Sequence, residues 1–300
     1  MQLFIGQKMI EIIYDKFEKQ RLDSFLSESF KDYSRSYFQN LISSKTAVLV
    51  NDKSVLASFK LKRGDAVKVE FPKEKSADIN PEKIPLDIIY EDNDIIVVNK
   101  QAGLVVHPSY GHTSGTLLNA LAYYAKNKFH PFMVHRLDKD TSGLIIFAKN
   151  EKSKISISKQ FAARAVKKLY YAAVKGTIVE NKGRIEAPIG RSPENRKLML
   201  VNPTAVKMAI TEFKVIARKS DYTLVEVRII TGRTHQIRSH MRYINHPVIG
   251  DIDYGGPCAV DNKAVKRQML HSHKITLTHP KTNKEIKFEA PLPKDIKELF

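Results

Sequence analysis

The sequence predicts an α+β protein of two domains: a small N-terminal α/β domain, and a larger domain with a mixed, mainly antiparallel sheet and flanking helices. Stretches with strand character outnumber amphipathic helical ones, and most strands occur as neighbours that a short turn can join into antiparallel pairs. Residues 73–85 are charged, flanked by prolines and without apolar periodicity, as expected of a linker. We therefore predict domains at 1–72 and 86–300.

The small domain is expected to contain two short helices packed on strands. Its predicted elements are a strand at 9–14, a helix that opens at 21–26, a helix over 35–42, a strand and turn at 48–53, and a strand at 61–71. Ser34 is the predicted N-cap of the second helix. Arg35 and Gln39 lie one turn apart on the polar face of that helix, so their side chains are expected to be neighbours.

The larger domain is predicted to alternate hairpins with helices. Its predicted elements are strands at 86–90 and 95–99, a helix at 116–126, a strand at 144–148, a helix at 153–165, a strand at 168–174, strands at 213–217 and 222–230, a helix after 234, and strands at 269–277 and 285–290. Between the first hairpin and the first helix, residues 103–115 form a loop rich in glycine and histidine. We expect Tyr124 to face inward and Thr234 to cap the helix that follows it.

The charge of the chain favours a polyanionic partner. Fifty Lys and Arg residues against 32 Asp and Glu give a formal charge of +18 and a pI near 9.7. A basic surface gains free energy by displacing the counterions condensed on RNA or DNA. The same composition also suits a protein that is cationic without such a partner.

Other features of the composition bear on the compartment. Cys258 is the only cysteine, which excludes an internal disulfide and a cysteine-rich zinc site and indicates a reducing environment. Lys8 and Glu11 interrupt the short apolar start before a signal sequence can form, and no run of about 18 apolar residues occurs. We expect a cytoplasmic protein that does not enter membranes.

A polar cluster at 134–143, directly before the apolar strand 144–148, is the strongest candidate for a reactive site. A carboxylate can act as a nucleophile if it stays ionised, and a nearby guanidinium favours the ionised form. An Asp with an Arg partner is therefore chemically sensible, but an ordinary structural salt bridge has the same composition. The side chains considered for this chemistry are Asp138, Asp140, Tyr170, Tyr171, Arg233 and Arg238.

Residues 15–72 resemble the small RNA-binding domain named after ribosomal protein S-four. The resemblance rests on Arg-Leu-Asp at 21–23, Ser-Arg-Ser-x-x-Gln-x-Leu-Ile at 34–42, Val-x-Val-Asn at 48–51 and Lys-x-Gly-Asp-x-Val at 62–67. It implies that Arg35 and Gln39, together with Arg21, contact RNA. The alternative from spacing alone is a solvated helix face.

Residues 86–300 resemble the pseudouridine synthases of the RluA type. Three ordered motifs carry this resemblance: His135-Arg136-Leu137-Asp138-x-x-Thr141-Ser142-Gly143, then Lys168-x-Tyr170, then the segment 231–238 with Thr-Gly-Arg-Thr-His-Gln-Ile-Arg. The pieces Arg267-Gln268-x-Leu270-His271 and Ala290-Pro291-Leu292-Pro293 are also typical of the group. The resemblance implies an isomerase that converts uridines in RNA to pseudouridine, without a metal or organic cofactor.

The resemblance also implies roles for single residues. Asp138 is the expected nucleophile, Tyr170 the residue that stacks on the uracil, and Arg238 the basic partner of Asp138. Arg136 is expected to fill the space left by a flipped-out uridine. Arg233 and His107 are expected to contact RNA phosphate or to shape the site. The route of attack, at C1′, at the base or through a glycal, stays open.

Three functional readings remain to be compared. We expect a monomeric enzyme acting on large-subunit (23S) ribosomal RNA, with transfer RNA as the alternative substrate. A non-catalytic RNA-binding factor for ribosome assembly is the second reading, and intact Asp138, Tyr170 and Arg238 argue against it. A glycoside or nucleoside hydrolase is the third, but it needs a second carboxylate and Asp140 stands at a variable position of the motif. No histidine pair has the H-E-x-x-H spacing of a zinc enzyme, so we expect no metal site.

Overall fold

In the computed structural model, the chain divides into two units, Met1–Asp78 and Ile79–Phe300. The structure describes residues 9–30, 33, 35–44, 46–71, 79–108 and 114–300. The predicted cap Ser34 lies outside these residues. None of the helices in the described part of the chain is both long and apolar enough to cross a lipid bilayer.

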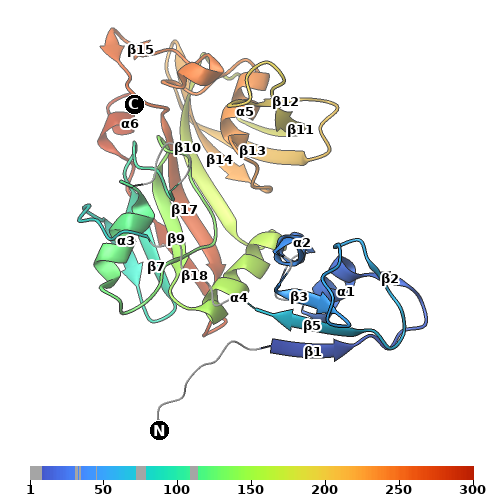
Figure 1. Cartoon of the computed structure of the whole chain (residues 1–300). Helices are drawn as coiled ribbons and strands as arrows, with labels where there is room; N and C mark the ends of the chain where they lie inside the picture. Colours follow the sequence, from blue (N-terminus) through green and yellow to red (C-terminus); the bar gives the residue numbers. More distant parts are fainter. Residues whose placement is uncertain (1–8, 31–32, 34, 45, 72–78, 109–113) are drawn as a thin grey trace. The chain divides into compact units, whose positions relative to one another are not determined.

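The N-terminal unit has a three-stranded antiparallel sheet in the order β1-β5-β3, with two helices packed on it (Figure 1). Its elements are β1 Met9–Ile13, β2 Gln20–Arg21, α1 Leu22–Ser29, α2 Arg35–Ser43, β3 Val48–Val50, β4 Lys60–Leu61 and β5 Ala66–Glu70. The apolar faces of α1 and α2 cover the sheet, with Leu22, Leu26 and Phe38 fully buried. Leu22 and Leu26 lie four residues apart, so the helical period puts both on the same face of α1, the face that is buried.

The second unit is built on one large sheet. Its strands are β6 Ile88–Glu91, β7 Ile95–Lys100, β8 Phe132–Met133, β9 Ser142–Ala148, β10 Lys167–Lys175, β11 Lys182–Arg191, β12 Met199–Val201, β13 Met208–Arg218, β14 Tyr222–Ile229, β17 Leu270–Thr278 and β18 Glu285–Glu289. The small strands β15 Ala259–Val260 and β16 Lys263–Ala264 pair with each other. The helices are α3 Leu117–Ala125, α4 Glu151–Ala162, α5 Gln236–Tyr243, η1 Ile252–Tyr254 and α6 Lys294–Lys297.

The strand order of this sheet is β12-β11-β13-β14-β10-β17-β9-β7-β6, with β18 beside β17 and β8 beside β9 (Figure 1). Among the named strand pairs only β9 and β17 are parallel. The predicted mixed, mainly antiparallel α+β fold is therefore confirmed. The parallel pair brings the end of the motif around Asp138 next to the strand that starts at Leu270.

Helices cover both faces of the sheet. In β7, Ile96 and Val98 pack in one core with side chains of α3 and α5, whereas Ile95 and Val97 pack in a second core with Ile157 of α4. Burial on both faces explains why β7 and β9 are continuous apolar runs instead of alternating ones. Tyr170 belongs to the first of these cores, on the face that also carries α5.

Some expectations for the second unit were wrong. Tyr124 is 42% exposed and donates a hydrogen bond to Glu91, so it lies at the edge of the apolar face of α3 and not inside it. Thr234 does not cap α5; the N-cap position is occupied by His235 in a left-handed conformation. Gln236 stabilises this turn instead, because its Oε1 accepts a hydrogen bond from the backbone amide of Arg233 at 3.0 Å.

Two further features differ from the sequence reading. Strand β11 was not predicted, since Gly183, Pro188 and Gly190 interrupt its pattern, yet Ile185 and Ile189 face the core. Part of the segment placed in the linker, residues 79–85, belongs to the second unit, where the Asn119 amide donates to Asn80 O at 2.8 Å. The backbone amide of Glu82 also donates to Asn119 O at 3.0 Å, so contacts with α3 hold this stretch.

Candidate active site

The loop between β8 and β9 holds Asp138 on a rigid base. The amide of Ile146 donates to His135 Nε2 at 2.9 Å, and Gln268 donates to the hydroxyl of Thr141 at 2.6 Å. Leu137 is buried in the core beside the site. Because these contacts fix both sides of Asp138, its carboxylate is presented at the edge of the sheet with little freedom.

Gly143 explains the end of the motif. Its φ is +107°, and a Cβ there would lie 2.2 Å from Ser272 O of the parallel strand β17. A side chain is therefore excluded both by backbone conformation and by space. Glycine at this position lets β9 and β17 approach each other directly beneath the site.

We expect Gly143→Ala to destabilise the second unit by about 3 to 5 kcal/mol, because positive-φ strain and overpacking add. Gly103→Ala is the matched control, since Gly103 also has a positive φ, of +84°, but no atom lies within 4 Å of its added Cβ. It is expected to lose only about 1 to 2 kcal/mol. Urea denaturation of both variants measures the difference, and equal losses would show that the contact with Ser272 has no cost.

Arg238 meets Asp138 although 100 residues separate them. Its Nη1 lies 3.3 Å from Asp138 Oδ2. The same guanidinium makes a bidentate pair with Asp251 through Nε and Nη2, at 2.6 and 2.8 Å, and Nη2 also lies 3.4 Å from Asp253 Oδ2. Burial would lower the pKa of Arg238, but the hydrogen bonds and charge of Asp251, with the charge of Asp138, raise it above its ordinary value.

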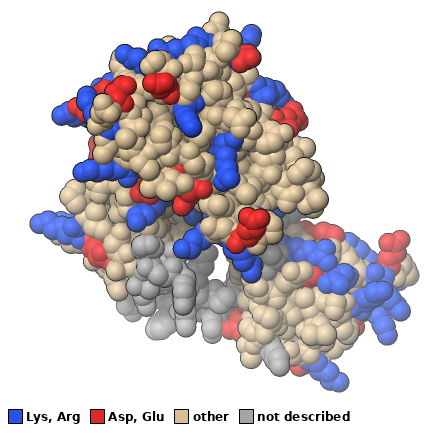
Figure 2. All heavy atoms as spheres, turned by 90° about the horizontal axis from the view of Figure 1, so that it is seen from above, with Lys and Arg blue, Asp and Glu red and all other residues tan. Residues whose placement is uncertain are grey.

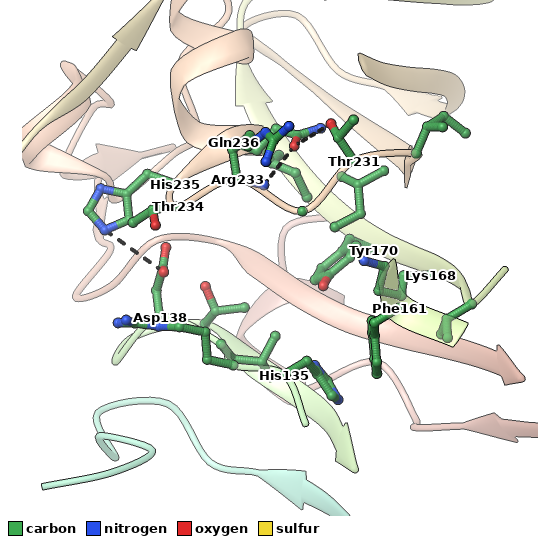
Figure 3. Close-up of a pocket in the computed structure, with 18 of the residues that line it drawn as sticks. His135, Asp138, Phe161, Lys168, Tyr170, Thr231, Arg233, Thr234, His235 and Gln236 are labelled. Carbon is green, nitrogen blue, oxygen red and sulfur yellow. Dashed lines mark hydrogen bonds and ion pairs between the residues drawn. The ribbon is translucent and has the colours of Figure 1, made fainter. Parts of the chain in front are cut away.

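His235 approaches Asp138 from another direction (Figure 3). Its Nε2 lies 3.8 Å from Asp138 Oδ1, and its Nδ1 is 2.9 Å from the hydroxyl of Tyr254. Burial lowers the pKa of His235, against the opposing charge of Asp138. A neutral imidazole beside the carboxylate leaves Arg238 as the main positive charge on it.

Asp138 opens onto a cavity of about 460 Å³. Figure 3 shows Asp138 and His235 facing each other on one side, with Tyr170, Lys168 and Phe161 grouped on the other. Tyr170 is 6% exposed, and burial raises the pKa of its hydroxyl. An aromatic ring opposite a carboxylate suits a flat, polar molecule such as a nucleobase.

The structure brings together most of the residues that the motifs suggested. Arg136 and Arg233 line the cavity with Asp138, Tyr170 and Arg238. Arg233 also donates from Nε to Met208 O at 3.2 Å. His107 does not line this cavity, and its Nδ1 lies 2.6 Å from Pro108 O.

The role of Lys100 was not predicted from the sequence. Lys100 is 1% exposed and donates to three carbonyl oxygens, those of Gln101, Leu104 and Lys139, at 2.8 to 3.0 Å. Burial lowers its pKa to about 7. In the sequence, the one sign of this role is that a lysine ends the apolar run of β7. In the fold, Lys100 supports the loop that carries Asp138.

In the N-terminal unit, Arg21, Arg35 and Gln39 gather around one buried carboxylate. Asp23 has no exposed surface and accepts hydrogen bonds from all three, at 2.8 to 3.1 Å. Burial would raise the pKa of Asp23, but these bonds hold it well below its usual value. Arg21 and Arg35 still expose nearly half of their side chains, so they are oriented by Asp23 and open to solvent.

His240 and His271 each have one ring nitrogen beside a protein hydroxyl. His240 lies 2.9 Å from the hydroxyl of Thr211, and His271 lies 2.9 Å from that of Ser142. Among the described residues, one group of metal-binding type occurs, formed by Asp92, Asp94 and His279. His279 Nε2 is already 2.7 Å from Asp92 Oδ2.

Comparison with known proteins identifies both units. Residues 94–243 match the model of the RNA pseudouridylate synthase family, and residues 20–67 match the S4 domain. An uncharacterised RNA pseudouridine synthase of Bacillus subtilis is 42% identical over 94% of both chains. Ribosomal large subunit pseudouridine synthase D of Neisseria meningitidis is 44% identical, over 93% of this chain and 78% of its own.

A solved structure supports the same grouping. The human RNA pseudouridylate synthase domain containing 1 superposes with a TM-score of 0.58 at 27% identity, over 70% of this chain and 84% of its own.

Proposed function

Since the chain belongs to the RNA pseudouridylate synthase family, we propose that it isomerises specific uridines of large-subunit ribosomal RNA, with Asp138 as the nucleophile. Pseudouridine forms when the N1–C1′ bond of uridine breaks and C5 bonds to C1′ in its place. The C5 proton is lost and N1 gains one, so the product is an isomer of uridine with the same composition. A relative named for the ribosomal large subunit supports this choice of RNA.

The observation that carries the proposal is the pairing of Asp138 with Arg238 at the mouth of a cavity that contains Tyr170. A carboxylate beside a fixed guanidinium stays ionised and oriented, as a nucleophile requires. Tyr170 offers a face on which the detached uracil can stack while it turns. A non-catalytic RNA-binding factor would not need this arrangement.

A uridine within folded RNA must leave its stack to reach Asp138. Arg136, two residues before Asp138, lines the cavity, and its side chain makes no hydrogen bond or ion pair within the described residues. A free guanidinium at this place can stack on the bases left behind. We assign this role to Arg136.

The test is a map of pseudouridines in ribosomal and transfer RNA from cells with and without the gene, read by carbodiimide modification. Loss of one or more sites in large-subunit RNA on deletion, restored by the wild-type gene, is the expected result. Loss of sites in transfer RNA alone would reassign the substrate. Identical maps would contradict the proposed activity.

We further propose that Arg21, Arg35 and Gln39 of the N-terminal unit contact RNA. Figure 2 shows Lys and Arg side chains on the visible surface of each unit, in line with a net charge of +18. The exposed halves of Arg21 and Arg35, held by Asp23, give fixed positive charges at low entropic cost.

Arg35→Gln tests this assignment while it keeps a hydrogen-bond donor for Asp23. We expect RNA binding to weaken, and the slope of log K against log salt to fall by about 0.7 to 0.9, as for one lost phosphate contact. Lys68→Gln, a lysine of the same unit paired with Asp52 at 2.6 Å, is the control. If both variants lose the same affinity, the assignment of Arg35 is wrong.

A further inference from the structure

Lys168 is a buried cation in the active-site cavity. The reaction proposed above assigns no role to it. It lies on β10, two residues before Tyr170, and its residue surface is 9% exposed. It lines the same cavity as Asp138 and Arg238. Figure 3 shows it beside Tyr170 and Phe161.

The ammonium of Lys168 has no polar partner in the described part of the chain. Among the described residues, no group accepts a hydrogen bond from it and no carboxylate lies within ion-pair distance. Its Nζ lies 5.3 Å from the ring centre of Phe161, and a Cβ added to Gly232 would lie 3.5 Å from it. Burial lowers the pKa of Lys168 to about 8, with no opposing charge to raise it.

An unpaired buried charge costs stability, so a chain that keeps one at this place uses it for a ligand. The surrounding charges indicate which kind. Arg136, Arg164 and Arg233 line the cavity as well, whereas Asp138 is its one described acidic residue and is already paired with Arg238. The cavity therefore has an excess of positive charge that suits an anion.

A backbone phosphate fits these surroundings better than a uracil carbonyl. A carbonyl oxygen is neutral, so one such contact offsets the charge of Lys168 less than an anionic phosphate oxygen does. Lysine binds phosphate as a point charge, and Gly232 leaves the space beside Nζ open because it has no side chain. Gly232 is itself exposed, so this part of the wall can be reached by the RNA strand.

We propose that Lys168 binds a phosphate next to the target uridine and so fixes the nucleotide strand in the cavity. The proposal rests on the proposed function, because it takes RNA as the ligand. Lys168 is then a substrate-binding residue that acts on the position of the sugar relative to Asp138.

The probe is an RNA hairpin that contains the uridine mapped above, made with natural phosphates or with a single uncharged methylphosphonate on the 5′ or 3′ side of that uridine. Dissociation constants are measured for the wild type, Lys168→Met and Lys168→Arg. We expect Lys168→Met to bind the natural hairpin about tenfold or more weakly, and Lys168→Arg to bind it nearly as well as wild type. One methylphosphonate hairpin should bind the wild type and Lys168→Met equally.

Two outcomes would overturn the proposal: an unchanged affinity of Lys168→Met for the natural hairpin, or an equal loss on all three hairpins. Turnover of the natural hairpin by the wild type is read separately. A hairpin that is bound in the expected pattern but not converted would contradict the proposed function and leave the phosphate contact standing.

Thermal unfolding and pH distinguish binding from a structural role. Removing an unpaired charge should leave the melting temperature of Lys168→Met equal or higher, whereas a structural lysine would lower it. Wild-type affinity should fall from pH 7 to pH 9 as Lys168 loses its proton, but that of Lys168→Arg should not. Of the titratable groups that line the same cavity, the arginines carry a side chain that stays charged over this range, and burial, with the charge of Lys168, lowers the pKa of His135 to about 3. An equal pH dependence in both proteins would count against the phosphate contact.

Discussion

Asp138→Asn should abolish pseudouridine formation while the fold is retained. An amide of the same shape cannot act as an anionic nucleophile, so we expect the rate to fall by at least about 10³-fold. Release of tritium from C5 of uridine-labelled RNA measures the reaction, because that proton leaves in each turnover. RNA affinity should stay at the wild-type level, since the cavity and its cationic side chains are unchanged.

The structure indicates that this substitution is tolerated by the fold. Asp138 is partly exposed, and Arg238 keeps its two bonds with Asp251 when Asp138 is neutral. We expect a change in stability within about 1 kcal/mol. Asp140→Asn is the matched control, because Asp140 lies two residues on and does not line the cavity. A fully active Asp138→Asn, or an inactive Asp140→Asn, would contradict the assignment of the nucleophile.

Much of the fold was predictable because it is encoded locally. Alternating apolar residues gave the hairpins β13–β14 and β17–β18, and helical spacing gave α1, α2 and α5. Strand β11 was not predicted because its glycines and proline interrupt the alternation of apolar and polar residues. The strand is defined by its pairing with β13, which is a long-range contact. The helix start at His235 escaped because its turn is stabilised by Gln236 and not by a capping hydroxyl.

The candidate site was predictable only where a motif marks it. Asp138 and Arg238 lie in motifs, so the resemblance implied their pairing, which the structure has at 3.3 Å. Asp251 and Lys100 had no such signal, although one fixes Arg238 and the other supports the loop of Asp138. Their importance comes from burial and long-range contact, which a local pattern does not contain.

Arg238→Met is expected to lower both the stability and the activity of the protein. Arg238 and Asp251 are almost completely buried and joined by two hydrogen bonds, so removal of the guanidinium leaves a buried carboxylate unpaired. We expect a loss of about 3 to 5 kcal/mol, which lowers the melting temperature of a unit of this size by about 6 to 20 °C. Activity should fall as well, because Asp138 loses its fixed positive partner.

A second variant separates the two effects. Arg238→Met combined with Asp251→Leu replaces the buried pair by apolar side chains, an exchange that is often neutral for stability. We expect calorimetry to show most of the lost stability restored, while tritium release stays as low as in the single variant. Recovery of activity together with stability would mean that Arg238 serves only to neutralise Asp251. Because no hydrogen bond or ion pair joins Asp251 to Asp138 among the described residues, persistent inactivity of the stable double variant points to the missing charge 3.3 Å from the nucleophile.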